Sequence, residues 1–317
     1  MKRLVYLFIV SWLMMVLAGC SGPQDQQPDP QQSAYQVIDS QGQVVKLMHK
    51  PQRIIPLSIG TDEIVVDLVP LERIAALTYL SDDPGISNVT EQAKLVAAKV
   101  KANPEQIIAL QPDLVIIPDW QPQELSQILR SADITVYVYH APNTVEEVKQ
   151  SIRELAKVLG EEQAGSQLIA RMDSELAAIK EQVDKVAAEQ RKTVIRFSLL
   201  GAGGGKDSLF DDLCRYAAVT NGAAAAGLGK YEMLSKEQIV QINPDVFIMP
   251  MWDYTGKTNM NQYREEVYGD PGLQSVKAVR NNQLIMAPDK YQNCSSHYIV
   301  YGVRDIARAA YPELKWQ

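Results

Sequence analysis

Two tryptophans are the side chains best suited by position to contact a ligand, because the same passage of sequence leads to each of them. Residues 105–120 and 237–252 are identical at eight of sixteen positions with a constant offset (237 − 105 = 132). The copies end in Trp120 and Trp252, and an indole offers a broad aromatic face to large, flat or greasy molecules. The spacing therefore predicts binding of a bulky ligand rather than catalysis.

The repeat also predicts the elements that position these tryptophans. Each copy has a short amphipathic helix, a Pro-Asp turn and an apolar strand, with the Trp just beyond the strand. An offset of this length is too long for a solenoid repeat and indicates two similar α/β lobes. Ligands of α/β sheets bind outside the carboxyl ends of the strands. We therefore expect a cleft between the lobes, with Trp120 and Trp252 on opposite lips.

Other chemistry finds little support in the sequence. No Ser-His-acid set or paired carboxylate has catalytic spacing. The glycine-rich residues 201–206 fail as a phosphate loop, because Leu200 stands where the first Gly belongs and Asp207 where Ser or Thr must hold magnesium. A loop that lets a ligand approach the backbone closely is the better interpretation. We expect no enzyme activity and no cofactor.

Direct binding of a bare metal ion is also not expected. The three histidines, His49, His140 and His297, show no mutual ligand spacing. His297 has three open interpretations: a ligand contact, a haem ligand, or a packed residue at a helix start. A disulfide between Cys214 and Cys294 also stays open, because sequence separation says nothing about their geometry.

From Arg53 to about residue 139 the chain alternates between strand and helix, which favours a mostly parallel sheet with helices on both faces. With the repeat, this predicts two similar lobes with mostly parallel sheets. We assign residues 35–143 to an N-terminal lobe, which opens with a hairpin, and residues 192–317 to a C-terminal lobe. Residues 144–191 form a helical segment between them. Thr144 and Glu147 predict a capping box for a first helix that Gly160 closes. A single apolar stripe then predicts one long interdomain helix from about 161 to 191.

The N-terminus predicts export. Two basic residues precede an apolar run at 4–16 that is shorter than the ~20 residues of a membrane helix, which indicates a signal peptide over residues 1–19. Leu17-Ala18-Gly19-Cys20 resembles a bacterial lipobox, which implies a lipid on Cys20; an ordinary signal with an incidental Cys is the alternative. Residues 20–34 read as a flexible tether. The expected location is the outer face of the cell membrane.

Charge narrows the range of partners. The formal net charge is −7, and loss of the two basic residues of the signal gives −9. Such acidity argues against nucleic acid as a partner.

Several motifs in order along the chain carry a family resemblance. They are Pro51-Gln52-Arg53-Ile54-Ile55, Ser58-Ile59-Gly60-Thr61-Asp62-Glu63-Ile64, both repeat copies, and Asp270-Pro271-Gly272-Leu273 with Val276-Lys277-Ala278-Val279. From about Val44 to Pro312 the chain resembles the substrate-binding lipoproteins of ABC importers for iron-siderophore complexes, haem and cobalamin. The resemblance implies a monomer that captures an iron(III)-siderophore, or alternatively cobalamin or haem, and delivers it to a permease dimer with its ATPase.

The resemblance also implies roles for individual residues. One Glu on each lobe would dock into Arg pockets of the permease, and the matching residues are Glu105 and Glu237. Tyr231 matches a position where the cobalamin binder of the family has a cleft aromatic. Apart from the resemblance, the expected position of the cleft at the strand ends gives the candidate ligand contacts. They are Ser58, Thr61, Tyr79 and Trp120 from the first lobe, and Arg196, Tyr231, Trp252, Tyr254, Lys290, Tyr291 and His297 from the second.

Two functions of other classes make different predictions. A surface-anchored enzyme would show turnover, for which the sequence shows no catalytic set. An adhesin or structural lipoprotein would need neither the paired tryptophans nor a docking Glu on each lobe.

Overall fold

The computed structural model describes residues 34–316. The expected signal peptide, the lipidation site at Cys20 and the tether up to residue 33 lie outside these residues. Between residues 34 and 316, no helix combines the length and apolar character needed to cross a membrane.

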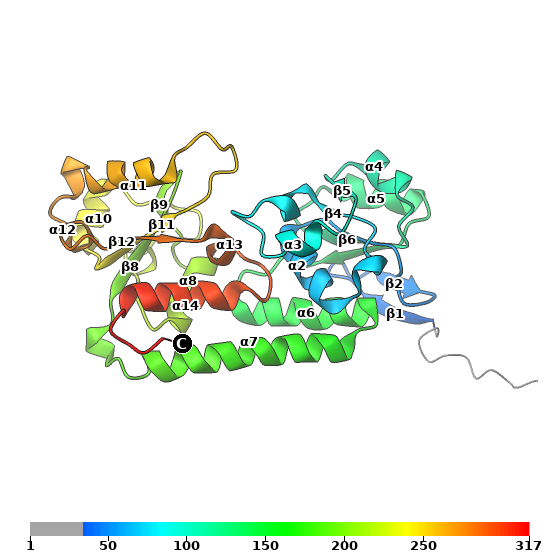
Figure 1. Ribbon diagram of the computed structural model, residues 1–317, viewed down its shortest axis with the longest axis horizontal. Helices are drawn as coiled ribbons and strands as arrows, with labels where there is room; N and C mark the ends of the chain where they lie inside the picture. Colours follow the sequence, from blue (N-terminus) through cyan, green and yellow to red (C-terminus); the bar gives the residue numbers. More distant parts are fainter. Residues whose placement is uncertain (1–33, 317) are drawn as a thin grey trace, which may run out of the picture.

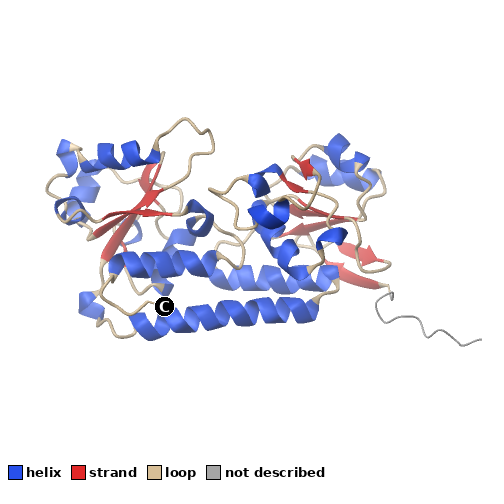
Figure 2. Ribbon diagram, viewed as in Figure 1, coloured by secondary structure: helices blue, strands red, loops and turns tan. Residues whose placement is uncertain are grey.

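Two α/β lobes stand side by side on a layer of long helices (Figure 1; Figure 2). The N-terminal lobe has an antiparallel hairpin, a parallel sheet in the order β3-β6-β7, and a parallel pair β4-β5 joined to β3 by a bridge between Ile54 and Ile74. Its strands are β1 (Tyr35–Ile38), β2 (Val44–Leu47), β3 (Ile54–Pro56), β4 (Leu77–Thr78), β5 (Lys99–Val100), β6 (Leu114–Pro118) and β7 (Val136–Tyr139).

The C-terminal lobe has a parallel sheet in the order β10-β8-β11-β12, and β9 pairs antiparallel with β8. The α/β class with parallel sheets in two lobes is thus confirmed. The strands are β8 (Thr193–Ser198), β9 (Gly201–Gly203), β10 (Thr220–Asn221), β11 (Val246–Pro250) and β12 (Leu284–Ala287).

The helices pack on both sheets and between the lobes. They are α2 (Ile59–Leu68), α3 (Thr90–Ala93), α4 (Pro104–Ala109), α5 (Gln123–Ser131), α6 (Val145–Leu159), α7 (Glu162–Val183), α8 (Leu209–Tyr216), α9 (Gly222–Ala225), α10 (Lys236–Ile242), α11 (Met260–Tyr268), α12 (Lys277–Arg280), α13 (Asp289–Gln292) and α14 (Ile299–Ala310).

The two repeat copies fold alike, in different sheets. α4 and β6 in one lobe correspond to α10 and β11 in the other at the same offset (236 − 104 = 246 − 114 = 132). The shared Asp anchors the neighbouring strand in each copy: Asp113 accepts from the backbone N–H of Arg53 at 2.8 Å, and Asp245 from that of Thr193 at 2.9 Å. The repeat therefore encodes the helix-to-strand corner of each lobe.

The first helix of the helical segment begins and ends where the sequence predicts. The Thr144 hydroxyl accepts from the Glu147 N–H at 3.1 Å, and Gly160 ends α6 with a left-handed φ of 71°. The reciprocal half of the capping box is displaced by one residue, because the Glu147 carboxylate accepts from the N–H of Asn143.

The predicted long helix is shorter than expected. α7 spans 22 residues, about 33 Å at ~1.5 Å per residue, and ends at Val183 rather than near residue 191. The chain must turn there to enter β8 at Thr193, and this tertiary requirement overrides the apolar periodicity.

Two segments without apolar periodicity contain regular structure. The glycine-rich residues 201–206 include β9, which pairs with β8 by backbone hydrogen bonds and so needs no apolar side chains. The polar segment 254–270 contains α11, which Asn259 caps by accepting from the Gln262 N–H at 3.1 Å. α11 buries only Val267, so its sequence shows little apolar periodicity.

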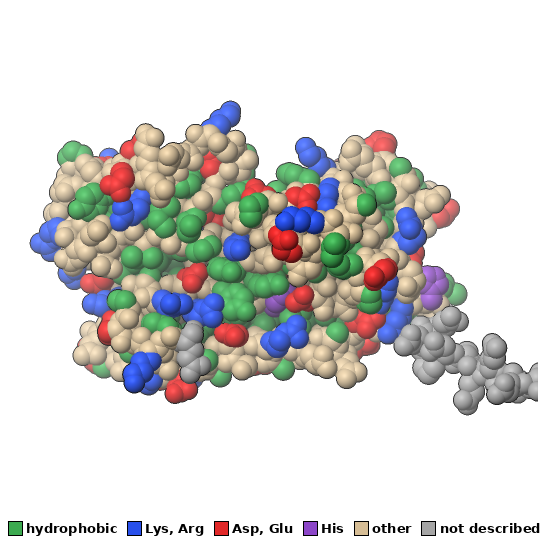
Figure 3. Space-filling view, in the orientation of Figure 1, with side chains coloured by type: hydrophobic (Ala, Val, Ile, Leu, Met, Phe, Trp, Pro, Cys, Tyr) green, Lys and Arg blue, Asp and Glu red, His purple; other side chains and the backbone are tan. Residues whose placement is uncertain are grey.

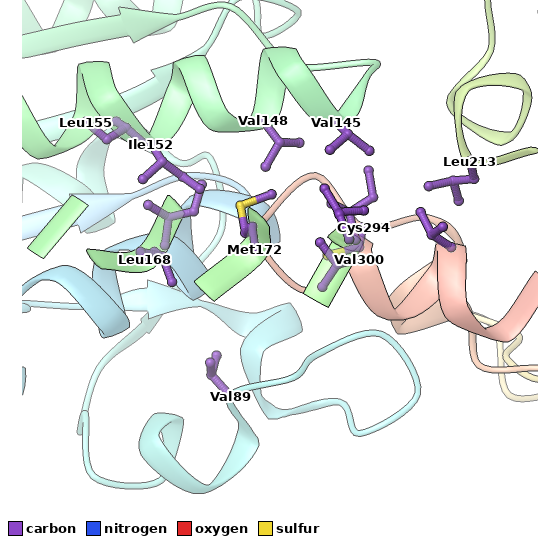
Figure 4. Packing of buried hydrophobic residues seen from close by; sticks show 14 of the residues in the cluster. Val89, Val145, Val148, Ile152, Leu155, Leu168, Met172, Leu213, Cys294 and Val300 are labelled. Carbon is purple, nitrogen blue, oxygen red and sulfur yellow. The ribbon is translucent and has the colours of Figure 1, made fainter. Parts of the chain in front are cut away.

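One hydrophobic core runs through both lobes by way of the helical layer (Figure 4). Apolar residues of α6 and α7, such as Val148 and Met172, share this core with Leu213 of α8 and Val300 of α14. A separate smaller core lies in each lobe. The lobes are therefore tied together by packing as well as by the chain.

Candidate ligand-binding site

A cavity of about 740 Å³ lies between the lobes, lined from both sides, and Figure 3 shows a notch between them at its upper edge. Asp119, Trp120 and His140 follow β6 and β7 directly, and Arg196 and Ser198 belong to the end of β8. The cavity is thus at the carboxyl ends of parallel strands, as α/β topology requires. Its size suits a ligand of several hundred Å³.

The N-terminal wall holds an oriented histidine. The Nδ1 atom of His140 lies 2.6 Å from Oδ2 of Asp119, and Oδ1 of Asp119 accepts from the Ala141 N–H at 3.2 Å. The β6-β7 register places Pro118 beside Tyr139 and so brings these two side chains together. A carboxylate on one ring nitrogen fixes the imidazole and leaves the other nitrogen, Nε2, for a ligand.

The C-terminal wall holds an arginine without a counter-ion. Within residues 34–316 the Arg196 guanidinium makes no hydrogen bond or ion pair, and its central carbon lies 6.0 Å from the centre of the Phe210 ring. Burial lowers the pKa of Arg196, while the charge of Asp289 acts in the opposite direction. The Asp289 carboxylate itself accepts from the N–H groups of Met251 and Trp252. The guanidinium is therefore free to bind an anionic group.

A second cation and an apolar rim complete the cavity. Lys230 donates to the side chain of Asn143 across the cavity and lies 5.2 Å from the centre of the Tyr231 ring. Trp120 is 63% exposed, Tyr231 85% and Leu200 90%. Exposed apolar groups around a hollow are typical of a binding site.

Three of the predicted ligand contacts lie in this cavity: Trp120, Arg196 and Tyr231. Ser58 and Thr61 lie outside it and bond to each other, with 2.9 Å between their hydroxyl oxygens. Thr61 is fully buried.

Tyr79 also lies outside the cavity, with the Lys101 ammonium 5.1 Å from its ring centre.

The second tryptophan is not equivalent to the first. The indole N–H of Trp252 donates to Oδ2 of Asp83, in the other lobe, at 2.8 Å, and the residue does not line the cavity. Of the two tryptophans expected to face the ligand, only Trp120 lines this cavity. The loops after β6 and β11 diverge, so an identical residue has different surroundings in each copy. Tyr254, 6.4 Å from Trp252 between ring centres, is 79% exposed and also lies outside the cavity.

The remaining predicted contacts lie near the lobe interface. Tyr291 packs edge-on against Tyr301 at 5.4 Å, and the backbone oxygen of Lys290 accepts from the side chain of Asn88. His297 is buried beside Asp67, with 3.1 Å from Nε2 to Oδ2, and lines a smaller hollow of about 200 Å³ between α7 and α14. Neither ring nitrogen of His297 makes a hydrogen bond to residues 34–316. A role in ligand binding for these residues stays a prediction.

Sequence reasoning missed most of the cavity wall. Asp119 and His140 each follow a predicted strand, so the rule that selected Trp120 could have found them. Phe210 gave no signal, because an aromatic residue at a helix start usually reads as core. The lining residues that the sequence did not predict include Asp119, His140, Asn143, Phe210, Lys230 and Ser295.

The two candidate docking residues are both exposed at helix starts. Glu105 stands in the first turn of α4 and Glu237 in the first turn of α10. A hydrogen bond with the Ser235 side chain lowers the pKa of Glu237. Both carboxylates are therefore placed to accept a cation from outside.

The structure also bears on the two cysteines and on metal binding. Cys214 and Cys294 are both buried and free, so they form no disulfide with each other. In the part of the chain from 34 to 316, three or more His, Cys, Asp or Glu side chains nowhere converge as they would around a metal ion.

Comparisons with known proteins agree with this architecture. The family model described as "Periplasmic binding protein" matches residues 54–291. The chain is 22% identical over 227 residues to the iron-uptake system-binding protein of Bacillus subtilis, covering 68% of each chain. It is 26% identical over 302 residues to the ferric-anguibactin-binding protein FatB of Vibrio anguillarum, covering 87% of each.

Solved structures show the same fold. The periplasmic heme-binding protein RhuT from Roseiflexus superposes with a TM-score of 0.70 at 23% identity, covering 82% of this chain and 98% of that one. The molybdate-binding protein MolA of Haemophilus influenzae gives 0.72 at 17% identity, covering 88% and 92%.

Proposed function

The chain belongs to the periplasmic binding protein family, and on that premise we propose that it captures an iron(III) chelate outside the cytoplasmic membrane and delivers it to the permease of an ABC importer. The observation that carries the proposal is the cavity of about 740 Å³, with exposed aromatic rings at its rim and with the guanidinium of Arg196, which has no salt-bridge partner among residues 34–316. Two relatives named for iron uptake and ferric anguibactin support iron as the cargo.

The cargo is a chelate rather than a bare ion. A naked iron(III) ion would need several oxygen or nitrogen ligands converging within about 2 Å of it, and residues 34–316 contain no cluster of three or more His, Cys, Asp or Glu side chains placed to supply them. A siderophore with residual negative charge would instead bind Arg196 and Lys230 through its polar groups. Its organic shell would cover the rings of Trp120 and Tyr231.

Haem is a second candidate, because His140 and Tyr231 line the same cavity from opposite lobes. Imidazole nitrogen and phenolate oxygen are both axial ligands of haem iron. Asp119 orients His140 in the manner expected of a metal-binding histidine. Bound haem would shift its Soret absorption on coordination, and His140→Ala would reverse that shift.

Delivery would use one carboxylate on each lobe. Glu105 and Glu237 are exposed and occupy equivalent positions in the two repeat copies. A carboxylate can accept a bidentate bond from an arginine, so a permease dimer could hold each lobe through one Glu. We further propose that Cys20 carries a lipid that anchors a monomer to the outer face of the membrane.

A thermal-shift screen tests the binding function. Ferric citrate, ferric hydroxamates, ferric catecholates, haem and cobalamin are each added to the protein. A ligand at a hundred times its dissociation constant stabilises the fold by about 2.7 kcal/mol, which is a clear shift in Tm. A protein that responds to none of them contradicts the proposal.

An uptake assay tests delivery. The double variant Glu105→Ala, Glu237→Ala should abolish uptake while the affinity for the chelate stays within a few-fold. Glu124→Ala with Glu266→Ala, exposed carboxylates on α5 and α11, is the matched control and should transport normally. Loss of affinity equal to the loss of uptake would argue against docking.

A further inference from the structure

The two lobes touch directly along a line beside the cavity, which we call the seam. On the N-terminal side it consists of Gly60, Glu63 and residues 83–88, and on the C-terminal side of Trp252, Lys290 and residues 295–296. The indole of Trp252 donates to Asp83 at 2.8 Å, the Asn88 amide donates to the Lys290 oxygen at 2.9 Å, and the Ser296 hydroxyl donates to Glu63. These bonds cross between lobes that the chain also joins through α6 and α7.

Two glycines show how closely the lobes approach at the seam. A Cβ at Gly85 would lie 2.1 Å from Cδ1 of Trp252, and a Cβ at Gly60 would lie 2.2 Å from Oγ of Ser295. Neither glycine has a φ in the left-handed region, so backbone conformation gives no reason for glycine. The close contact itself is the reason.

Both partners of the Trp252 contact are held rigidly by their own lobes. Oδ1 of Asp83 accepts from the N–H of Gly85 at 2.8 Å, which leaves Oδ2 for the indole. On the other side, the N–H of Trp252 donates to Asp289 at 2.9 Å. Because each group is held by its own lobe, the hydrogen bond between Trp252 and Asp83 fixes the distance between the two lobes.

We propose that Trp252, Asp83 and Gly85 form an interlobe clamp that sets the spacing of the lobes and thereby the width of the chelate cavity. The clamp and the cavity are mechanically connected, because Ser295 touches Gly60 in the seam and also lines the cavity. Trp252 is therefore a positioning residue that selects ligands by size without touching them. This inference rests on the proposed function for the nature of the ligand.

Hydrogen exchange on the ligand-free protein tests the clamp. Trp252→Phe keeps a ring over Gly85 and removes the indole donor, and Gly85→Ala forces the lobes apart by the width of a methyl group. Backbone exchange in residues 79–88 and 251–254 should become roughly tenfold faster in both variants, the value of about one hydrogen bond to an ionised group. Gly272→Ala, where the nearest atoms are movable side-chain atoms, is the control and should exchange as the wild type does.

The screening panel then measures size selection. The affinity ratio between the largest and smallest chelates bound should shift in favour of the larger one by roughly tenfold in Trp252→Phe. Wild-type exchange rates in both variants, or an unchanged affinity ratio, overturn the clamp. A wild-type protein that binds no chelate refutes the proposed function instead, while the exchange experiment still decides on the clamp.

Discussion

Replacing Arg196 with Met should weaken ligand binding without a comparable loss of protein stability. The guanidinium lies in the cavity wall without a counter-ion among the described residues, and burial lowers its pKa. A desolvated cation destabilises the ligand-free protein, and this penalty is offset only when an anionic ligand binds to the cation. The variant should therefore bind less well without being less stable.

The expected sizes of the two effects follow from the ligand-bound and the ligand-free protein. A hydrogen bond to a charged group contributes about 1.5–3 kcal/mol, so the dissociation constant for an anionic chelate should rise roughly 10- to 150-fold. In the ligand-free protein the free energy of unfolding should rise, or fall by no more than about 1 kcal/mol, because Met keeps the packing against Phe210. Arg196→Lys should lie between the two, since it keeps the charge and loses the planar fork.

Calorimetric titration and urea unfolding measure the two quantities on the same samples. Arg280→Met, which removes an exposed arginine of α12, controls for net charge and should leave affinity unchanged. An Arg196→Met protein that loses several kcal/mol of stability would show that the guanidinium has a structural partner, and the anion-binding argument would then be wrong.

Three further predictions concern the cavity and the helical layer. His140→Ala should weaken haem binding at least tenfold while a fully coordinated ferric hydroxamate binds as before, by titration of each. Asp119→Asn should give a smaller loss for haem than His140→Ala, because it disturbs only the orientation of the imidazole. Lys149→Met should lower the free energy of unfolding at pH 7 by about 1–3 kcal/mol, since the buried ammonium joins Glu146 on α6 to Asp173 on α7. The Lys149 hydrogen bond lowers the pKa of Glu146 below its ordinary 4.5, so this stability is present above about pH 4.5 and is lost as the pH falls through the lowered value, which urea unfolding at pH 7 and pH 3 would show.

Local signals in the sequence predicted the fold well. Thr144 and Gly160 bound α6 because capping and a left-handed end depend only on neighbouring residues. The shared Pro-Asp of the repeat predicted the two corners, and the structure adds that each Asp anchors the next strand. By contrast, the end of α7 depends on where β8 begins, which no local pattern contains.

The site was only partly predictable, because its contacts join distant parts of the chain. His140 shows no ligand spacing to another histidine, and its partner Asp119 comes from 21 residues away through the β6-β7 register. Trp252 occupies the same position in its repeat copy as Trp120, yet its indole binds Asp83, which is 169 residues away in the sequence. The shared tryptophan thus predicted correctly that each residue follows a strand, but it did not predict the different surroundings of Trp252.

The shared core limits how the protein can exchange its ligand. Separating the lobes widely would expose apolar residues of α6, α7, α8 and α14 that now pack together. Exposing even ~200 Å² of such surface costs about 5 kcal/mol, comparable to the whole stability of many domains. Ligand entry must therefore leave the helical layer intact, and the direct contacts that distinguish one chelate from another fall to the exposed rim at Trp120, Leu200 and Tyr231. Substitutions at this rim should alter which chelate binds, whereas substitutions in the core should alter only whether the protein folds.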